Sequence, residues 1–443
     1  MTPFASLFVP AELQAAVSGR AWLVAMLDAE RALANAGALA GVVPAHEASA
    51  IAEACAVDNY DWEELLQAGR RVGNPAEPLV RALVARVGEE TGRWTHLGAT
   101  SQDIMDTAAM LVARQALGLV LDDLSRVTDA CATLARSYRG TPMAGRTLLQ
   151  QAVPTTFGLK AAGWLVAVLD ARARLVQLRR DGLAAQLGGA AGTLAALGEH
   201  GLEIARLYAR ELDLADPTLP WHTNRVRVAE LGAALGIAVG VLAKVGLDLA
   251  LLAQTEVAEV REGRERGGSS TMPQKRNPVG AAMTRACAEL ARAHASVLTR
   301  TLEQEHERSV GPWHAEWEAL SGALAYTGGA AAALAGALEG LEVDGARMRA
   351  NLDITGGQVV AERLALLLTD RLGRTAARAL VRDASLRANE TGRSLAEELA
   401  GRDTGRTSEE IEAALEPTTY LGSAGALVDR ALARYDAERE DEV

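Results

Sequence analysis

The chain has 443 residues, of which 49% are hydrophobic and only 4% aromatic, so its core must be built from Ala, Leu and Val, a composition that favours closely packed helices. Its net charge is −12 with acidic and basic residues interspersed, which excludes a nucleic-acid surface, since that needs a clustered basic face. A small anionic substrate is compatible with this charge, because a local cationic pocket can lie on an acidic protein.

Three cysteines, Cys55, Cys131 and Cys287, lie far apart and without paired spacing. This spacing predicts free thiols in a reducing compartment, and neither a disulfide framework nor a zinc site. The N-terminus shows no basic segment followed by an apolar stretch, so we expect no signal peptide and a cytoplasmic location.

Almost every periodic segment has helical spacing, beginning with a stripe of Trp22, Met26, Ala29 and Leu33 from which Glu30 is excluded. No segment shows four or more clean alternations of apolar and polar residues bounded by turn signals. We therefore predict an all-α protein.

Proline and glycine separate helical stretches of unusual length. Each would form a helix of about 40–50 Å at 1.5 Å per residue; the stretches are residues 112–139, 156–186, 226–262, 278–308 and 315–340. Helices that are apolar on most sides imply burial in a large bundle and against other subunits. Because the chain ends hold shorter helices, we expect three domains, at residues 1–109, 110–354 and 355–443.

The longest apolar run covers residues 231–253 and contains Lys244 and Asp248. Both charges would be costly in lipid, so we predict a helix buried in a bundle rather than a membrane span.

A first candidate site lies in residues 95–107, Thr-His-Leu-Gly-Ala-Thr-Ser-Gln-Asp-Ile-Met-Asp-Thr. Thr100 and Ser101 would stand at a helix N-terminus, where free N–H groups and the helix dipole favour an anion. Ordinary N-capping by Thr and Ser is the alternative for this stretch taken alone.

A glycine-rich stretch at residues 188–193 invites comparison with phosphate-binding loops. It follows a helical pattern rather than a strand, so the context of a dinucleotide-binding loop is missing. We expect a bend between two helices.

The most informative stretch is residues 268–278, Gly-Ser-Ser-Thr-Met-Pro-Gln-Lys-Arg-Asn-Pro. Glycine lets the backbone approach a ligand closely, and the paired serines supply hydroxyl and N–H groups. Lys275 and Asn277 would hold an anionic oxygen, so the loop is suited to stabilise negative charge that develops beside a carboxylate. A solvated surface turn is the alternative for a shorter Gly-Ser-Ser string.

These stretches, together with residues 145–160, resemble the signature regions of the fumarase/aspartase superfamily, and the similarity runs from about residue 7 to about residue 430. Segments 220–227, 252–260 and 303–318 are most similar to its bacterial carboxymuconate cycloisomerase branch. The resemblance implies a three-domain all-α fold whose long central helices pack into a homotetrameric core. It also implies active sites shared between three subunits.

The second signature region usually contains Thr-His-x-Gln. Thr147 and Gln150 match this pattern, but Leu148 replaces the histidine. Since an amine or alkoxide leaves badly without protonation, the change points to a leaving group that is already a weak base, such as a carboxylate. The resemblance then implies reversible lactonisation of 3-carboxy-cis,cis-muconate through an aci-carboxylate carbanion, in β-ketoadipate aromatic catabolism.

By resemblance, Ser269 is the proton donor in the lactonising direction and the base in the reverse one. His96, Lys275 and Asn277 are the other catalytic candidates. The expected substrate contacts are Thr100, Ser101, Thr147, Gln150, Ser270, Arg276, Trp221, His222 and Arg308.

We expect no cofactor, no nucleic-acid or membrane partner, and no metal. His306 and His314 lack the spacing of a zinc-binding helix, and Gly311-Pro312 breaks any helix between them. Packing or a hydrogen bond to the substrate edge is the preferred interpretation of both histidines.

Other functions stay open. One is a lyase on the same scaffold with another good leaving group, such as nitrite from nitrosuccinate, and adenylosuccinate lyase is a second. A non-catalytic structural or binding protein is the alternative from a different class, and the intact Ser269, Lys275 and Asn277 argue against it.

Overall fold

The computed structural model describes residues 3–263, 267–268 and 271–440. The chain divides into two compact units. Unit 1 comprises Met1–Ser125, Asp170–Lys244 and Met283–Leu334, and unit 2 comprises Arg126–Leu169, Val245–Ala282 and Ala335–Val443. The division passes through the long helices, which are α7 (Ser101–Ser137), α8 (Phe157–Gln177), α10 (Val226–Leu252), α11 (Val279–Arg300) and α12 (Pro312–Glu339).

These long helices confirm the predicted all-α fold, although their ends differ from the prediction. Helix α7 starts eleven residues before the predicted residue 112, directly after the Thr100 turn. The predicted helix over 226–262 is too long, because α10 ends at Leu252 and a turn follows, in which Ala258 adopts a left-handed backbone with φ of 52°.

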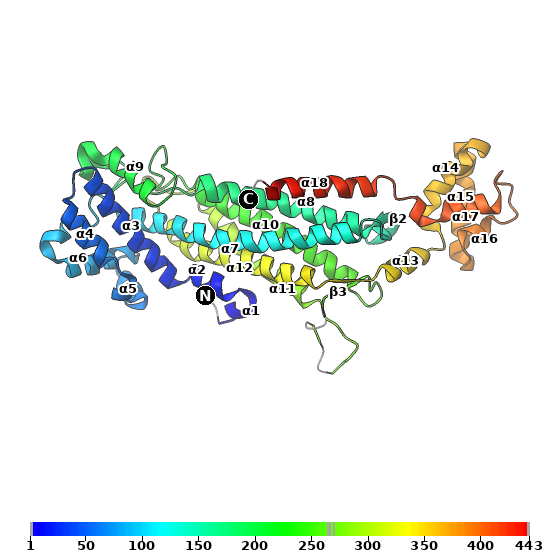
Figure 1. Ribbon diagram of the computed structural model, residues 1–443, viewed down its shortest axis with the longest axis horizontal. Helices are drawn as coiled ribbons and strands as arrows, with labels where there is room; N and C mark the ends of the chain where they lie inside the picture. Colours follow the sequence, from blue (N-terminus) through cyan, green and yellow to red (C-terminus); the bar gives the residue numbers. More distant parts are fainter. Residues whose placement is uncertain (1–2, 264–266, 269–270, 441–443) are drawn as a thin grey trace. The chain divides into compact units, whose positions relative to one another are not determined.

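In unit 1, short helices pack together around α3 (Gly19–Leu39). The Ser18 side chain accepts a hydrogen bond from the N–H of Ala21 and caps the start of α3. Helix α3 contacts α4 and α9, and α4 contacts α6, an arrangement that Figure 1 shows. The remaining short helices of this unit are α1 (Ala5–Phe8), α2 (Ala11–Ala16), α4 (Ala45–Ala54), α5 (Trp62–Gly69), α6 (Ala76–Gly92) and α9 (Gly201–Glu211), with 3₁₀ turns at Val57–Asn59 and Ala195–His200 and a π-helical turn at Leu178–Gly182.

Unit 2 contains strands that we did not predict. Strands β1 (Pro142–Thr147) and β2 (Gln150–Thr156) form an antiparallel hairpin, and β3 (Val260–Arg261) pairs with β4 (Glu342–Val343). The hairpin was missed because Gly145 weakens the strand pattern, Pro154 cannot donate to a ladder, and the register shifts between Ala144 and Arg146.

The C-terminal part of unit 2 is a group of short helices around an apolar core that includes Leu364, Leu368 and Leu395. Capping boxes formed by Ser394 with Glu397 and by Thr407 with Glu410 start two of these helices. The helices around this core are α14 (Ala361–Leu372), α15 (Arg374–Thr391), α16 (Leu395–Leu399) and α17 (Ser408–Leu415). Unit 2 also contains α13 (Gly345–Asp353) and α18 (Ala424–Glu440), with 3₁₀ turns at Gln358–Val360 and Pro417–Thr419.

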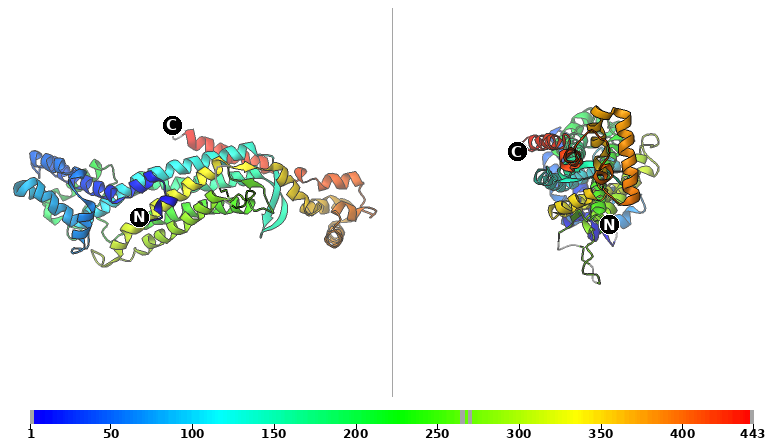
Figure 2. Two further views of the ribbon diagram at one scale, coloured as in Figure 1. Left: turned by 90° about the horizontal axis from the view of Figure 1, so that it is seen from below. Right: turned by 90° about the vertical axis from the view of Figure 1, so that its right-hand side faces the viewer.

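Helix α18 lies beside the C-terminal end of α7, as Figures 1 and 2 show. The Tyr435 hydroxyl donates to Asp129 over 2.6 Å, and the guanidinium of Arg139 donates to Asp429 over 2.6–2.7 Å. These contacts attach the last helix of the chain to a helix formed some 300 residues earlier.

Two helices among the described residues, α7 and α10, are long and apolar enough to cross a membrane. Core helices of large bundles satisfy the same criterion, and the most apolar part of α7 is 78% buried within the chain. The corresponding part of α10 is only 44% buried. One chain therefore leaves much of the most apolar helix uncovered.

Candidate active site

Residues 95–107, the first signature region, include the start of α7 in unit 1. The N–H of Thr100 donates to Asp103 Oδ2 over 2.9 Å, so a carboxylate of the helix's own first turn caps it. Thr100 and Ser101 stand at the helix N-terminus as predicted, and both are partly exposed.

Asp103 also organises the glycine-rich bend. Its carboxylate accepts hydrogen bonds from the N–H groups of Gly188 and Gly189, each over 2.9 Å, and lies 2.6 Å from His222 Nε2. The protein's own carboxylate thus occupies N–H groups that a phosphate would need in a nucleotide loop. Residues 188–193 lie in the predicted bend.

A second acidic residue on the same helix face anchors a buried ion-pair network. The Arg225 guanidinium donates to both Asp106 oxygens, over 2.8 and 3.0 Å, and to Glu316 Oε1 over 3.1 Å. Trp313 Nε1 donates to Asp106 over 2.9 Å, and the Trp221 ring lies 4.8 Å from the guanidinium carbon. All these groups are buried, where charges are tolerated only when paired.

The predicted substrate contacts Trp221, His222 and Arg308 lie around the 185–190 bend. Trp221 Nε1 donates to the carbonyl of Ala185 over 2.9 Å, and Arg308 donates to the carbonyl of Ala190 over 2.8 Å. Since Trp221 and His222 are buried, their polar atoms hold the bend within a single chain. Substrate contact by these three residues stays a prediction.

His96 lies in the turn before α7 and contacts Glu30, which the sequence pattern placed outside the apolar stripe of α3. Its Nδ1 lies 2.6 Å from Glu30 Oε1, and Glu30 is only 1% exposed. The interpretation of Glu30 as lying outside the apolar stripe was wrong, because the ion pair with His96 allows a carboxylate to sit in the core face of α3.

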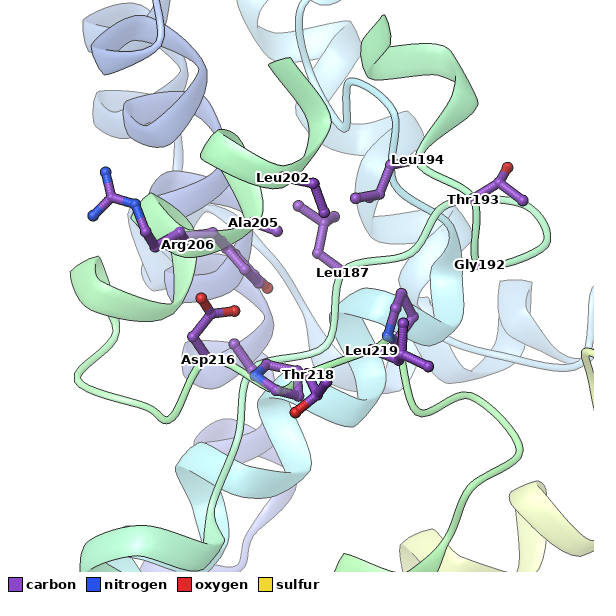
Figure 3. A pocket seen from close by; sticks show the side chains of 14 residues that line it. Leu187, Gly192, Thr193, Leu194, Leu202, Ala205, Arg206, Asp216, Thr218 and Leu219 are labelled. Carbon is purple, nitrogen blue, oxygen red and sulfur yellow. The ribbon is translucent and has the colours of Figure 1, made fainter. Parts of the chain in front are cut away.

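A hollow of about 490 Å³ lies beside this bend, between α9 and residues 216–220 (Figure 3). Leucines 187, 194 and 202 line it, and Arg206 and Asp216 add charge. No predicted catalytic or substrate-binding residue lines this hollow. It is not the predicted site.

In unit 2, the second signature region forms the tip of the β1–β2 hairpin. Thr147 pairs with Gln150 across a two-residue turn in which Leu148 and Leu149 have φ values of 51° and 65°. Such turns favour Asn-Gly, because a leucine in the left-handed region is sterically strained. Leu148 is 97% exposed, so the strain is not relieved by packing within the chain.

A buried carboxylate ties the hairpin, at the residue before its tip pair, to the segment that leads into the third signature region, residues 268–278. Arg146 donates to both oxygens of Glu259, over 2.7 and 3.0 Å, and Asn351 Nδ2 donates to Glu259 Oε1 over 2.8 Å. Glu259 is completely buried. The geometry of the hairpin and the entrance of the loop are therefore fixed together.

Another buried acid, Glu262, binds the start of α11, which follows the third signature region. Glu262 accepts hydrogen bonds from the N–H groups of Gly280 and Ala281, each over 2.8 Å, at the start of α11. Inside the loop, the N–H of Asn277 donates to the carbonyl of Gly267 over 2.9 Å. Lys275 and Arg276 are exposed, while Ser269 and Ser270 lie outside the described residues.

The histidines considered for metal binding have other surroundings. The His314 ring packs against Trp313 and Trp317, with ring centroids 4.9 and 5.1 Å apart, and the carbonyl of His306 accepts from Thr223. Among the described residues, no group of three or more His, Cys, Asp or Glu side chains is arranged to hold a metal ion.

Comparison with known proteins identifies the family of the chain. Residues 11–291 match the lyase family, and residues 357–431 match the family described as adenylosuccinate lyase C-terminus. The chain belongs to the fumarase/aspartase superfamily of lyases.

Individual superfamily members are similar over nearly the whole chain. Identity is 48% to 3-carboxy-cis,cis-muconate cycloisomerase of Bradyrhizobium diazoefficiens, covering 95% of both chains. It is also 48% to nitrosuccinate lyase of Streptomyces davaonensis, covering 95% of this chain and 92% of that one. The crystal structure of 3-carboxy-cis,cis-muconate lactonizing enzyme from Pseudomonas putida is 42% identical, with a TM-score of 0.92 and coverage of 98% and 99%. The 3-carboxy-cis,cis-muconate cycloisomerases of Pseudomonas aeruginosa and Pseudomonas putida are also similar, at 47% and 44% identity.

Within this superfamily fold, unit 1 brings together His96, Thr100, Ser101, Trp221, His222 and Arg308, and unit 2 holds Thr147, Gln150, Lys275, Arg276 and Asn277. The carboxylates that position them were missed, namely Glu30, Asp103, Asp106, Glu259 and Glu262. For Asp103, Asp106, Glu259 and Glu262, a usable signal was their place within or beside the signature regions, whereas Glu30 lies outside all three. Acids there are suited to hold N–H groups and cations.

Proposed function

We propose that the protein is a 3-carboxy-cis,cis-muconate cycloisomerase of the β-ketoadipate route. Leu148, whose hydrocarbon side chain stands at the hairpin tip between Thr147 and Gln150, supports a leaving group that needs no proton, and the similarity to several cycloisomerases supports a carboxylate over nitrite. The Leu148 side chain cannot protonate a leaving group. In the reverse, eliminating direction the lactone releases a carboxylate, a stable anion that needs no such proton.

The proposed reaction joins a carboxylate oxygen of the substrate to a carbon of the conjugated double bond. The displaced electron pair moves to the carbon alpha to another carboxylate, forming an aci-carboxylate with two negative charges. A proton from Ser269 then completes the lactone. Preorganised donors that meet this charge are worth several kcal/mol in a closed site.

We assign the charge-stabilising role to Lys275, Asn277, Thr100, Ser101 and Thr147. Gln150, Ser270, Arg276, Trp221, His222 and Arg308 complete the proposed substrate contacts. Ser269 needs its acidity tuned by loop N–H groups and by Lys275, in a loop that excludes water once substrate is bound.

The proposed assembly is a homotetramer whose active sites combine signature regions from three subunits. The low burial of α10 within one chain supports it, because an apolar helix of that length is stable when neighbours cover it. The exposure of Leu148, Lys275 and Arg276 supports it as well, since a site for carbanion chemistry must exclude water. We also propose a cytoplasmic location.

A nitrosuccinate lyase is the second candidate, favoured by the 48% identity to the Streptomyces enzyme. Nitrite is also a weak base that leaves without general acid help, so Leu148 fits both reactions. Elimination from nitrosuccinate would use the same carbanion and the same Ser269.

The proposal is tested by measuring kcat/KM for 3-carboxy-cis,cis-muconate, nitrosuccinate and adenylosuccinate with the same tetramer preparation. We expect carboxymuconate to be preferred by about a hundredfold or more, which corresponds to about 2.7 kcal/mol of transition-state discrimination. Faster turnover of nitrosuccinate would replace the first candidate by the second. The Ser269→Ala variant should lose most turnover while keeping its fold.

A further test uses Leu148→His. Restoring a histidine should not create substantial adenylosuccinate or fumarate lyase activity, because residues 313–317 also depart from the phosphate-binding string of adenylosuccinate lyases. A strong gain of either activity would show that the leaving-group argument is wrong.

A further inference from the structure

Two buried histidine–carboxylate pairs lie near the start of α7, and they differ in what surrounds them. In one, Asp103 binds His222 but also three backbone N–H groups, those of Thr100, Gly188 and Gly189. Only 5% of the His222 side chain is exposed. This pair is fully engaged in holding the bend.

The second pair, Glu30 with His96, is poorer in other contacts. Among the described residues, Glu30 Oε2 has no hydrogen-bond partner, and Oε1 is bound by His96 Nδ1. No hydrogen bond within the described part of the chain engages His96 Nε2, and 17% of the His96 side chain is exposed. The imidazole therefore has one nitrogen held by the core carboxylate, while Nε2 has no hydrogen-bond partner in the described part of the chain.

The backbone holds His96 in this orientation. Its φ of 58° is left-handed, which a histidine adopts only at a cost. Two residues later Gly98 has φ of 72°, and a Cβ there would lie 2.4 Å from Leu197 Cγ. This close packing restricts the backbone of the turn and therefore the position of the His96 ring.

Folding alone gives no reason for a carboxylate at position 30. A buried carboxylate with a single partner is costly, and an apolar side chain of similar volume is often as stable or more stable. Among the residues that the structure describes, Glu30 has one polar contact, and that contact is to His96 of the first signature region. Its presence in the core is explained if this contact serves the reaction.

The charged state of the ring follows from its neighbours. Burial lowers the pKa of His96, but the charge and hydrogen bond of Glu30 and the charge of Asp103 outweigh burial and raise this pKa. Tyr208 on α9 and Cys55 after α4 also face Glu30, and burial raises the pKa of both, that of Cys55 to about 12. Neither group carries a positive charge that could replace the His96 ring as the partner of Glu30.

We propose that Glu30 is a positioning residue for the reaction, which holds His96 as an imidazolium through Nδ1 and directs its Nε2–H toward a carboxylate of the substrate. The identity of that substrate rests on the proposed function, but the geometry of the pair does not. His96 then acts as a charged donor that binds and orients a carboxylate, rather than as a base.

The experiment compares Glu30→Gln, Glu30→Asp and the control Glu47→Gln. Glu47 is another buried glutamate of unit 1, and its histidine neighbour, His46, is exposed. The first readout is the NMR titration of histidine-labelled protein, with the His96 signal assigned from His96→Gln. We expect its titration to move to lower pH in Glu30→Gln, to be largely retained in Glu30→Asp, and to be unchanged in Glu47→Gln.

The second readout is the pH profile of kcat/KM for 3-carboxy-cis,cis-muconate. In Glu30→Gln the alkaline limb should move to lower pH, with a loss of about tenfold or more at pH 8 that falls mainly on KM. Adding Glu30→Gln to His96→Gln should cost little more, because the two residues act as one unit. Glu30→Asp, which keeps the carboxylate, should restore part of the loss and also serves if the glutamine variant fails to fold.

Unchanged titration of His96 and an unchanged pH profile in Glu30→Gln would overturn the proposal, as would an equal loss in Glu47→Gln. The titration needs no substrate. A wild-type protein that fails to convert carboxymuconate but shows the expected His96 titration would reject the proposed function while retaining the pair.

Discussion

The polar residues at the start of α7 and those of the hairpin and loop in unit 2 differ in how completely one chain satisfies them. Around α7, Asp103, Asp106 and Glu316 are buried and hydrogen-bonded. In unit 2, the side chains of Leu148 and Lys275 are exposed, while Glu259 binds Arg146 beside the hairpin tip and Glu262 binds the start of α11.

This difference separates side chains whose geometry is fixed by folding of one chain from side chains that remain exposed to solvent in that chain. Buried pairs fix geometry during folding, at the cost of desolvating charges. Exposed groups keep their hydration until a substrate or another subunit covers them, so their electrostatic strength is gained only at that step. Variants in the two regions should therefore separate effects on stability from effects on turnover.

The largest effect on stability is expected for Arg225→Met. Removal of the guanidinium leaves the buried carboxylates of Asp106 and Glu316 without their cation, which costs about 3–5 kcal/mol. Denaturant unfolding measures this cost. The matched control is Arg20→Met, whose partner Asp58 is exposed, with an expected change within about 1 kcal/mol. Similar losses of unfolding free energy in both variants would show that the buried network contributes no more to stability than an exposed ion pair.

The hairpin tip should show the opposite behaviour. Replacing Leu148-Leu149 with Asn-Gly removes left-handed strain and should stabilise the protein by about 1–2 kcal/mol, while lowering kcat/KM. Asp213→Gly is the control, since Asp213 also has a positive φ of 52° and a fully exposed side chain. It should not lower kcat/KM. A stabilised hairpin variant with full activity would indicate that the tip has no role in the site.

A smaller effect is expected at the base of the loop. Glu262→Ala removes the acceptor for two N–H groups of α11 and should cost about 1 kcal/mol, with a clear loss of turnover. Glu397→Ala removes an exposed capping-box acceptor from the start of α16 and should leave turnover unchanged. Equal turnover in the two variants would mean that closing the loop base does not prepare the site.

The smallest expected effect is a pH dependence of stability from His96. Its pKa is raised in the folded protein, although burial opposes the increase, because Glu30 and Asp103 favour the charged ring. The contribution is therefore fully present below the unfolded value of about 6.5 and is lost as pH rises through the folded value. Unfolding free energies of wild type and His96→Gln should differ most near pH 6 and converge at higher pH. A difference in unfolding free energy between the two proteins that increases with pH would contradict a raised pKa of His96 in the folded state.

Much of the fold follows from the sequence, because long apolar stretches between Pro and Gly leave few alternatives to long helices. The signature stretch at 268–278 also indicates its chemistry, since its residue types suit an anionic intermediate. The hairpin was not predictable from alternation, because Gly145 and Pro154 interrupt the strand pattern and tertiary contacts of Arg146 with Glu259 hold it near its tip.

The supporting carboxylates were hidden for a different reason. Glu30 and His96 are 66 residues apart, and Asp103 meets Gly188 across 85 residues, so no local pattern relates them. Charged residues within helices normally predict a solvated face. Their burial depends on a partner that only the folded chain supplies.

The most direct test of the proposed chemistry is to add the protein to 3-carboxy-cis,cis-muconate in D₂O while following ultraviolet absorbance, and to identify the product by NMR. The account predicts a rapid loss of the absorbance of the conjugated diene and a lactone with one deuterium on the carbon alpha to a carboxylate. It also predicts that Ser269→Ala shows neither change. Unchanged absorbance with a folded wild-type protein, or a lactone that carries no deuterium, would contradict a carbanion protonated in this site.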